Sequence, residues 1–181
     1  MYINCDNSLL LVIDFQEKLA NVMDSQRIQE VRLNCSKLIK GFQLFNSPII
    51  YTQQYTKGLG ETVSELKNLL PFSHIEKTSF SCLGEPMFLE ALEKTNKKHI
   101  VLAGMETHIC VLQTALDLLH NNYSVTVLSD VTVSRNLKNH EVALELLRIG
   151  GAHILPFESV LFMLLKDAKN PLFREVSKLI K

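Results

Sequence analysis

Short apolar runs that alternate with helical patterns constrain the fold of this chain more than any other feature of its sequence. The runs are rich in Val, Ile and Leu, too short for helices and typical of buried strands; they are 9–13, 49–52, 100–103, 125–128 and 152–155. Between them, apolar residues recur every three or four positions and predict helices over 28–45, 86–94, 107–121 and 138–149. This order predicts a three-layer α/β/α sandwich with a mostly parallel, Rossmann-like central sheet.

Two segments depart from this alternation. Residues 51–81 carry Gly58, Gly60 and Pro71 and show no regular period, so we expect a long excursion over the carboxyl edge of the sheet. Residues 171–181 repeat apolar side chains at helical spacing, which predicts a short helix docked on the core. The chain has 181 residues, of which 46% are hydrophobic, and this suffices for one substantial core. We therefore expect a single domain over residues 1–181.

Charge balance and cysteine spacing argue against several classes of protein. Nineteen basic residues balance nineteen acidic ones without a Lys/Arg stripe, so we expect a small-molecule substrate and no nucleic-acid partner. No window approaches the roughly 18 apolar residues of a membrane span, and the first residues do not resemble a secretion signal. Cys5, Cys35, Cys82 and Cys110 form no Cys-x-x-Cys pair, which favours free thiols over disulfides or structural zinc. We expect a cytoplasmic protein that does not bind membranes.

Three ionisable residues lie where they could converge on one site. Cys110 lies where the run 100–103 turns into a helical pattern, and a thiol in the first turn of a helix meets unpaired N–H groups that favour the thiolate. Asp14 ends the run 9–13, and Lys77 lies in the irregular excursion. If the two strands are neighbours at the switch point of the sheet, Asp14 and Cys110 approach each other. Asp14 would then take the thiol proton, Lys77 would stabilise the anion, and sulfur would attack an electrophilic carbon.

Pattern and spacing leave simpler roles open for all three residues. An Asp that ends a strand is often only a turn or cap residue, and a Lys is usually a solvated surface charge. A Cys near the start of a helix is often a small buried hydrophobe. The residues by themselves therefore do not decide between an active site and ordinary structure.

Four segments, in the family's order and over nearly the whole chain, resemble the isochorismatase-like cysteine hydrolases. They read LLVIDFQE at 10–17, EKTSFS at 76–81, GMETHICVLQTA at 104–115 and LSDVTVSR at 128–135. The resemblance is to the compact isochorismatase domain-containing proteins, and it implies a catalytic triad of Asp14, Lys77 and Cys110. It also implies a cis peptide at Met105–Glu106 and an oxyanion hole formed by the backbone N–H groups of Glu106 and Cys110. Members of this family are commonly oligomeric, so we expect a homo-oligomer.

The residues after the second predicted strand argue against a metal cofactor. Nicotinamidase relatives carry an Asp-x-His metal motif there, whereas this chain reads YTQQY at 51–55. Amide side chains are poor ligands for a zinc-type metal, so we expect no metal and no cofactor. True isochorismatases hydrolyse a vinyl ether and need no thiol, so the presence of Cys110 favours a small amide or related acyl substrate.

Residues beside these motifs are the candidates for substrate binding. They are Phe15, Gln16, Gln53, Tyr55, Phe80, Thr107 and Ile109. Core packing is an equal alternative for Phe15 and Phe80, and a structural ion pair or loop anchor suits Asp130 and Arg135 better than catalysis. Two further functions stay open: a vinyl ether hydrolase in which Asp14 is the acid and the thiol is dispensable, and a non-catalytic scaffold or thiol sensor.

Overall fold

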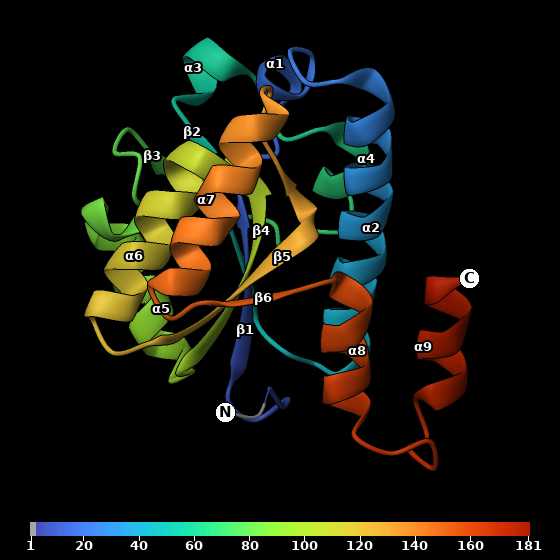
Figure 1. The fold of residues 1–181 in the computed structure, drawn as a ribbon. Helices are drawn as coiled ribbons and strands as arrows, with labels where there is room; N and C mark the ends of the chain where they lie inside the picture. The colour runs from blue at the N-terminus through green and yellow to red at the C-terminus, as the bar shows by residue number, and fades with distance from the viewer. Residues whose placement is uncertain (1–2) are drawn as a thin grey trace.

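Six parallel strands form the central sheet of the protein, seen in a computed structural model that describes residues 3–181 (Figure 1). Across the sheet they lie in the order β3 (Ile75–Lys77), β2 (Ile49–Gln54), β1 (Ser8–Ile13), β4 (His99–Met105), β5 (Ser124–Val133) and β6 (His153–Leu155). Every neighbouring pair is parallel, so the predicted Rossmann-like sheet is confirmed.

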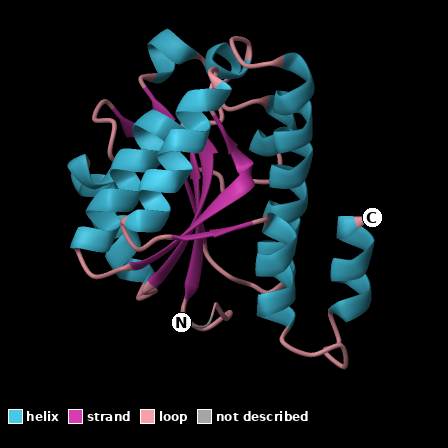
Figure 2. Cartoon of the chain, in the orientation of Figure 1, coloured by secondary structure: helices cyan, strands magenta, loops and turns pink. Residues whose placement is uncertain are grey.

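Helices cover both faces of this sheet (Figure 2). One layer contains α5 (Pro86–Thr95), α6 (Leu112–His120) and α7 (Leu137–Ile149), and the other contains α2 (Ser25–Leu44), α8 (Phe157–Leu165) and α9 (Phe173–Ile180). The short helices α1 (Glu17–Ala20) and α3 (Thr56–Leu59) lie beyond the carboxyl ends of the strands, and α4 (Ser64–Lys67) lies beside α2. The predicted three-layer sandwich is therefore confirmed. Among residues 3–181, no helix combines the length and the apolar character needed to cross a membrane.

Strand β1 shows why the strands read as continuous apolar runs. Leu10 and Val12 pack into the core beneath α2 and α8, whereas Leu9, Leu11 and Ile13 pack into the core beneath α5 and α6. Because successive side chains of a strand point to opposite faces, a strand covered on both faces must be apolar at every position.

The strand order reverses at β1, which pairs with β2 on one side and β4 on the other. The predicted neighbourhood of these strands is thus confirmed, and ligands of such sheets bind beyond the carboxyl ends at this switch point. The two strands come close there, since a Cβ on Gly104 would lie 2.3 Å from the carbonyl oxygen of Ile13. Gly104 also has a φ of +145°, so this position requires glycine.

Two elements of the fold differ from the sequence prediction. The segment 51–81 was expected to be irregular, but Ile75–Lys77 within it form the edge strand β3. This strand has only three residues, two of them charged, and therefore lacks an apolar run. Helix α8 has nine residues that are mostly apolar, and it escaped prediction because it shows no alternation of polar and apolar faces.

Candidate active site

A buried ion pair joins the ends of β1 and β3. Asp14 follows β1 with a φ of +52°, and its Oδ2 lies 2.7 Å from Nζ of Lys77, the last residue of β3. Its Oδ1 accepts a hydrogen bond of 2.7 Å from the Thr52 hydroxyl, and its backbone N–H donates to the carbonyl of Thr52. Both charged side chains are completely buried. The pair therefore has a fixed geometry rather than that of a mobile surface contact.

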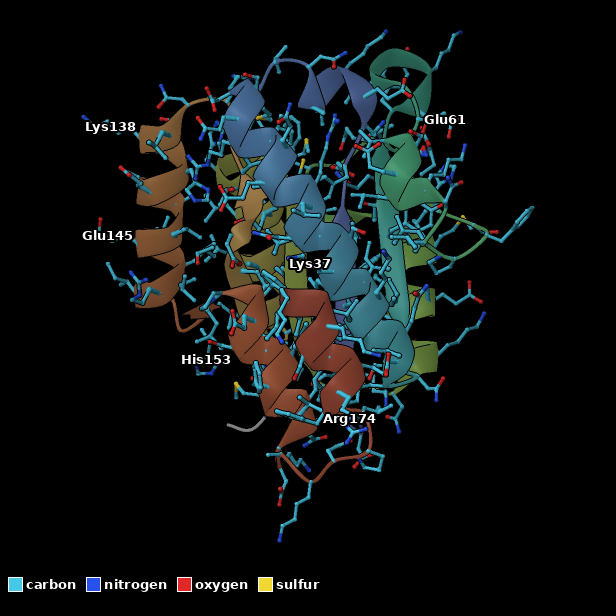
Figure 3. All side chains as sticks on the ribbon, turned by 90° about the vertical axis from the view of Figure 1, so that its right-hand side faces the viewer. Lys37, Glu61, Lys138, Glu145, His153 and Arg174 are labelled. Carbon is cyan, nitrogen blue, oxygen red and sulfur yellow. The ribbon has the colours of Figure 1, made fainter. Side chains whose placement is uncertain are left out.

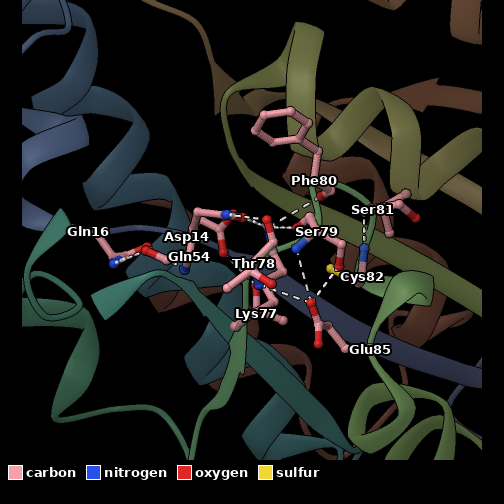
Figure 4. A network of polar contacts seen from close by, with 12 residues as sticks. Asp14, Gln16, Gln54, Lys77, Thr78, Ser79, Phe80, Ser81, Cys82 and Glu85 are labelled. Atoms are coloured by element: carbon pink, nitrogen blue, oxygen red, sulfur yellow. Dashed lines mark hydrogen bonds and ion pairs between the residues drawn. The ribbon is translucent and has the colours of Figure 1, made fainter. Parts of the chain in front are cut away.

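The Lys77 ammonium is held on several sides (Figure 4). Besides Asp14, it donates to Oε1 of Gln54 at 2.5 Å and to the carbonyls of Ser79 and Phe80 at 3.2 and 3.3 Å. Glu85 in turn holds this loop, since its Oε1 accepts from the Ser79 N–H and hydroxyl. Lys77 is thus positioned to orient Asp14.

Cys110 completes this cluster. It lies in a π-helical turn, Thr107–Val111, that joins β4 to α6, and its side chain is 6% exposed. Its thiol lies close enough to Asp14 and Lys77 for both charges to act on its pKa. Three residues that are 63 and 33 positions apart in the chain are therefore brought together, as the sequence predicts.

The turn that carries Cys110 is clamped by the segment after β5. The peptide bond Met105–Glu106 is cis, as the resemblance implied. The buried Glu106 carboxylate accepts from the backbone N–H of Arg135 at 2.9 Å and from its guanidinium at 3.1 Å. His108 Nδ1 lies 2.9 Å from the Ser134 hydroxyl. We call these contacts and the next one the turn clamp.

The third contact of the turn clamp joins α7 to the start of the π-helical turn. The Thr107 hydroxyl lies 2.8 Å from Nδ1 of His140, and both side chains are buried. Burial lowers the pKa of His140 to about 4, with a smaller contribution from Arg27, so the imidazole is neutral near pH 7. Sequence reasoning missed this residue, because nothing near His140 in the chain indicates that it contacts Thr107.

Comparison with known proteins now decides the family. The model of the isochorismatase domain matches residues 8–159. The chain belongs to the isochorismatase family of hydrolases. It is 40% identical over 182 aligned residues to the secreted isochorismatase effector Isc1 of Phytophthora sojae, covering 97% of this chain and 85% of that one.

Two solved structures share the fold of this isochorismatase-family chain. The MAR1 ribonuclease from Caenorhabditis elegans is 35% identical, with a TM-score of 0.92 over 99% of this chain and 92% of that one. The YcaC protein from Escherichia coli, described as an octameric hydrolase of unknown specificity, is 24% identical, with a TM-score of 0.90 over 99% and 89% of the two chains.

Burial sets the protonation of the cluster. Burial raises the pKa of Asp14 above its ordinary value despite the opposing charge of Lys77. Burial by itself would lower the pKa of Lys77, but the neighbouring Asp14 and Cys110 raise it. Burial and the Asp14 charge raise the pKa of Cys110 to about 12, while Lys77 opposes them. The site therefore rests as a thiol beside an ion pair, and the helix-start effect expected from the sequence is outweighed.

The seven candidate substrate-binding residues fall into two groups. Phe15 packs into the core beneath α2, and the buried Gln16 side chain bonds the backbone of Gln54 and Gly60. Gln53 is also buried and bonds Glu61. These contacts are those of structural residues.

The remaining candidates lie nearer to Cys110 or to solvent. Phe80 and Tyr55 are 54% and 53% exposed, and the Phe80 carbonyl contacts Lys77. Ile109 is partly buried beside the nucleophile, whereas Thr107 is occupied by His140. Phe80 and Ile109 are therefore the candidates best placed to meet a ligand.

The residues at the expected metal position bind protein groups instead. Gln53 and Gln54 hydrogen-bond to Glu61 and Lys77, respectively. Within residues 3–181, His, Cys, Asp and Glu side chains form no group of three or more that could hold a metal ion. The two residues that the sequence suggested as anchors do act as such: Asp130 accepts from the Phe157 N–H, and Arg135 pairs with Glu106.

Proposed function

We propose that this protein is a metal-independent cysteine hydrolase of small amides or related acyl compounds, with Cys110 as nucleophile and Asp14 and Lys77 as its partners. One observation carries the proposal: the Asp14–Lys77 ion pair is completely buried, and both of its charges act on the nearby thiol of Cys110. A buried ion pair is costly unless its partners satisfy it, and perturbed ionisable groups of this kind cluster at functional sites.

The first half of the reaction transfers the acyl group to sulfur. Asp14 accepts the thiol proton while Sγ of Cys110 attacks the carbonyl carbon, and the C=O electron pair moves to oxygen. The raised pKa of Asp14 makes it a better proton acceptor than an ordinary carboxylate. The C–N bond then breaks as Asp14 returns the proton to nitrogen, so that an amine leaves and a thioester remains.

The second half releases the product. Water attacks the thioester carbon and gives a proton to Asp14; the C–S bond breaks, and the proton returns to sulfur. The backbone N–H groups of Glu106 and Cys110 are the proposed donors to both oxyanions. Lys77 holds the Asp14 carboxylate in place throughout, and Phe80 and Ile109 would contact the acyl group.

The mechanism uses only protein side chains and water, so the proposal includes no cofactor. We further propose that residues 1–181 act as one hydrolase domain and, given the octameric YcaC structure, as a homo-oligomer. Four free cysteines support a cytoplasmic location, although the relative Isc1 is named a secreted effector.

A panel of small amides, esters and vinyl ethers tests this function. We expect one amide or ester to be hydrolysed by the wild-type protein, and turnover to be lost in Cys110→Ala and Cys110→Ser with an unchanged circular dichroism spectrum. A thioester-linked acyl group on Cys110, trapped by acid quench and seen by peptide mass spectrometry, would identify the intermediate.

The raised pKa of Asp14 favours one second candidate, because a protonated Asp14 can act as the acid of a vinyl ether hydrolase. In that case Cys110→Ala keeps its turnover of a vinyl ether while Asp14→Asn loses it. The name of the MAR1 structure adds RNA to the panel, and RNA cleavage that survives Cys110→Ala would contradict the cysteine mechanism. Peroxide-sensitive Cys110 without any turnover would identify a thiol sensor instead.

A further inference from the structure

Cys82 is a second buried thiol beside the proposed active site, and the proposed mechanism does not use it. It begins the short 3₁₀ turn η1 (Cys82–Gly84), which follows the loop whose carbonyls hold Lys77 (Figure 4). Its side chain is completely buried, in the same apolar cluster as Cys110. Buried free cysteines often serve only as small hydrophobic residues, so a further role for Cys82 has to come from its polar neighbours.

Helix α6 holds Cys82 next to the proposed nucleophile. The backbone N–H of Cys82 donates a hydrogen bond of 3.0 Å to the Thr114 hydroxyl, and both groups are buried. Thr114 follows Cys110 by four residues, or about one helical turn, so the two side chains lie on the same side of the helix. Cys82 is therefore fixed beside the helical face that carries Cys110.

The ion pair of Asp14 and Lys77 connects the two thiols. Burial works to lower the pKa of Lys77, whereas Asp14 and both thiols raise it. Because such electrostatic effects weaken with distance, the sulfur atoms of Cys82 and Cys110 both lie near the Lys77 ammonium. The Thr52 hydroxyl, which donates to Asp14, also acts on the pKa of Cys82. Two thiols thus share one buried ion pair.

The two thiols differ in their access to solvent and would therefore react in a fixed order. Cys110 is 6% exposed, whereas Cys82 has no exposed surface. Burial and the Asp14 charge raise the pKa of Cys82 to about 12, while Lys77 opposes them. A small oxidant in solution can thus reach Cys110, and Cys82 meets only a group that is already attached to Cys110.

We propose that Cys110 and Cys82 form a reversible disulfide, an oxidative modification that switches the proposed hydrolase off. The proposal rests on Cys110 being the nucleophile of the proposed function. Its oxidant is a hydroperoxide: Sγ of Cys110 attacks the terminal peroxide oxygen, and the O–O bond breaks. Asp14 accepts the thiol proton and passes it to the leaving oxygen, so that an alcohol leaves and a sulfenic acid remains on Cys110.

Cys82 then resolves the sulfenic acid. Its Sγ attacks Sγ of Cys110, the S–O bond breaks, and the Cys82 proton leaves with the hydroxide as water. Two thiols and one hydroperoxide thus give one disulfide, one alcohol and one water, and a dithiol reductant reverses the change by exchange. A sulfenic acid without a partner thiol is oxidised further to a sulfinic acid, which thiols do not reduce. Cys82 therefore keeps the oxidation of Cys110 reversible.

Peptide mapping of the full-length protein tests the proposal without a known substrate. The wild-type protein is treated with a small excess of hydrogen peroxide and then denatured in iodoacetamide, which blocks every remaining thiol. Mass spectrometry of the unreduced peptides should show a pair joined by a Cys82–Cys110 disulfide and a matching loss of alkylated Cys110. Treatment with dithiothreitol before the iodoacetamide step should restore nearly all of the alkylated Cys110.

The variant Cys82→Ser removes the second thiol at almost constant volume. After the same peroxide treatment, dithiothreitol should restore a fraction of Cys110 about tenfold smaller than in wild type, because the sulfenic acid proceeds to the sulfinic acid. The matched control is Cys35→Ser, a change at another completely buried thiol. Cys35 lies on α2, the helix that carries Lys37 and faces the viewer in Figure 3, on the other side of the sheet. This control should recover like wild type, and circular dichroism verifies that both variants are folded.

Two results would overturn the proposal: no Cys82–Cys110 disulfide in the oxidised wild type, or equal recovery of Cys110 in Cys82→Ser and wild type. The panel of amides and esters separates this failure from that of the proposed function. Hydrolysis by a protein that forms no disulfide would contradict the disulfide alone. A reversible disulfide in a protein that hydrolyses no member of the panel would support the thiol pair and contradict the hydrolase.

Discussion

The resting state of Cys110 shows how two neighbouring charges act on one thiol. Asp14 raises its pKa and Lys77 lowers it, while burial raises it further, to about 12. A preformed thiolate is therefore disfavoured, and the proton moves to Asp14 only when a substrate carbon accepts the sulfur electrons. A resting thiol of this kind differs from a thiolate stabilised by the start of a helix. It predicts that Asp14 and Lys77 have opposite effects on the pKa of Cys110.

Removing Asp14 and removing Lys77 should shift the reactivity of Cys110 in opposite directions. Asp14→Asn removes a negative charge and should lower the pKa of Cys110, whereas Lys77→Met should raise it. At pH 9 the first variant should react with iodoacetamide faster than wild type and the second more slowly, by roughly tenfold per pKa unit. Peptide mass spectrometry after timed quenching measures the rates.

Cys35 is the internal control for this experiment, because its raised pKa results from burial without a charged neighbour. Its slow alkylation should be equal in all three proteins. Shifts of Cys110 in the same direction for both variants would contradict the opposing roles of Asp14 and Lys77.

The ion pair of Asp14 and Lys77 should also make a large contribution to the free energy of unfolding. Lys77→Met leaves the buried Asp14 carboxylate without its cation, so the free energy of unfolding should fall by about 3–5 kcal/mol. Asp14→Asn combined with Lys77→Met should cost less than the sum of the single changes. Urea denaturation measures both, and a loss below about 1 kcal/mol for Lys77→Met would assign the pair the strength of a surface contact.

At the scale of elements, the turn clamp explains how a π-helical turn keeps its shape. Glu106, Thr107 and His108 are three consecutive residues, and each contacts the segment that runs from the end of β5 into α7. Helix α7 and the preceding loop therefore hold the turn that carries Cys110.

The bond between Thr107 and His140 can be measured by a double-mutant cycle. His140→Phe leaves the buried Thr107 hydroxyl unpaired and should lower the free energy of unfolding by about 1–3 kcal/mol. Thr107→Val together with His140→Phe should cost less than the sum, with a coupling energy of about 1 kcal/mol. The control cycle combines Thr107→Val with His120→Phe, a change at an exposed histidine. An equal coupling energy in that cycle would refute a specific contact between Thr107 and His140.

At the scale of the whole molecule, the sequence was sufficient to predict those features that depend on local residue patterns. The continuous runs around Leu11 and Leu102 identified the central strands, and the strand-end positions of Asp14 and Cys110 identified the site. Strand β3 could not be predicted, because Glu76 and Lys77 occupy two of its three positions. The turn clamp escaped for another reason: its partners are 26 to 33 residues apart and meet only through the fold.

Stability of the whole molecule should depend on pH through two buried histidines. Burial lowers the pKa of His99 and of His140 to about 4, below the value of about 6.5 in an unfolded chain. A depressed pKa contributes stability that is complete above pH 6.5 and is lost as the pH falls through 4, at most about 3.4 kcal/mol for each histidine.

His140→Gln should therefore lose less free energy of unfolding than wild type between pH 7 and 4. The carboxylates are common to both proteins and cancel in this difference, and the exposed His120→Gln should follow wild type. Urea denaturation at each pH measures the slopes, and equal slopes for His140→Gln and wild type would mean that His140 titrates normally in the folded state.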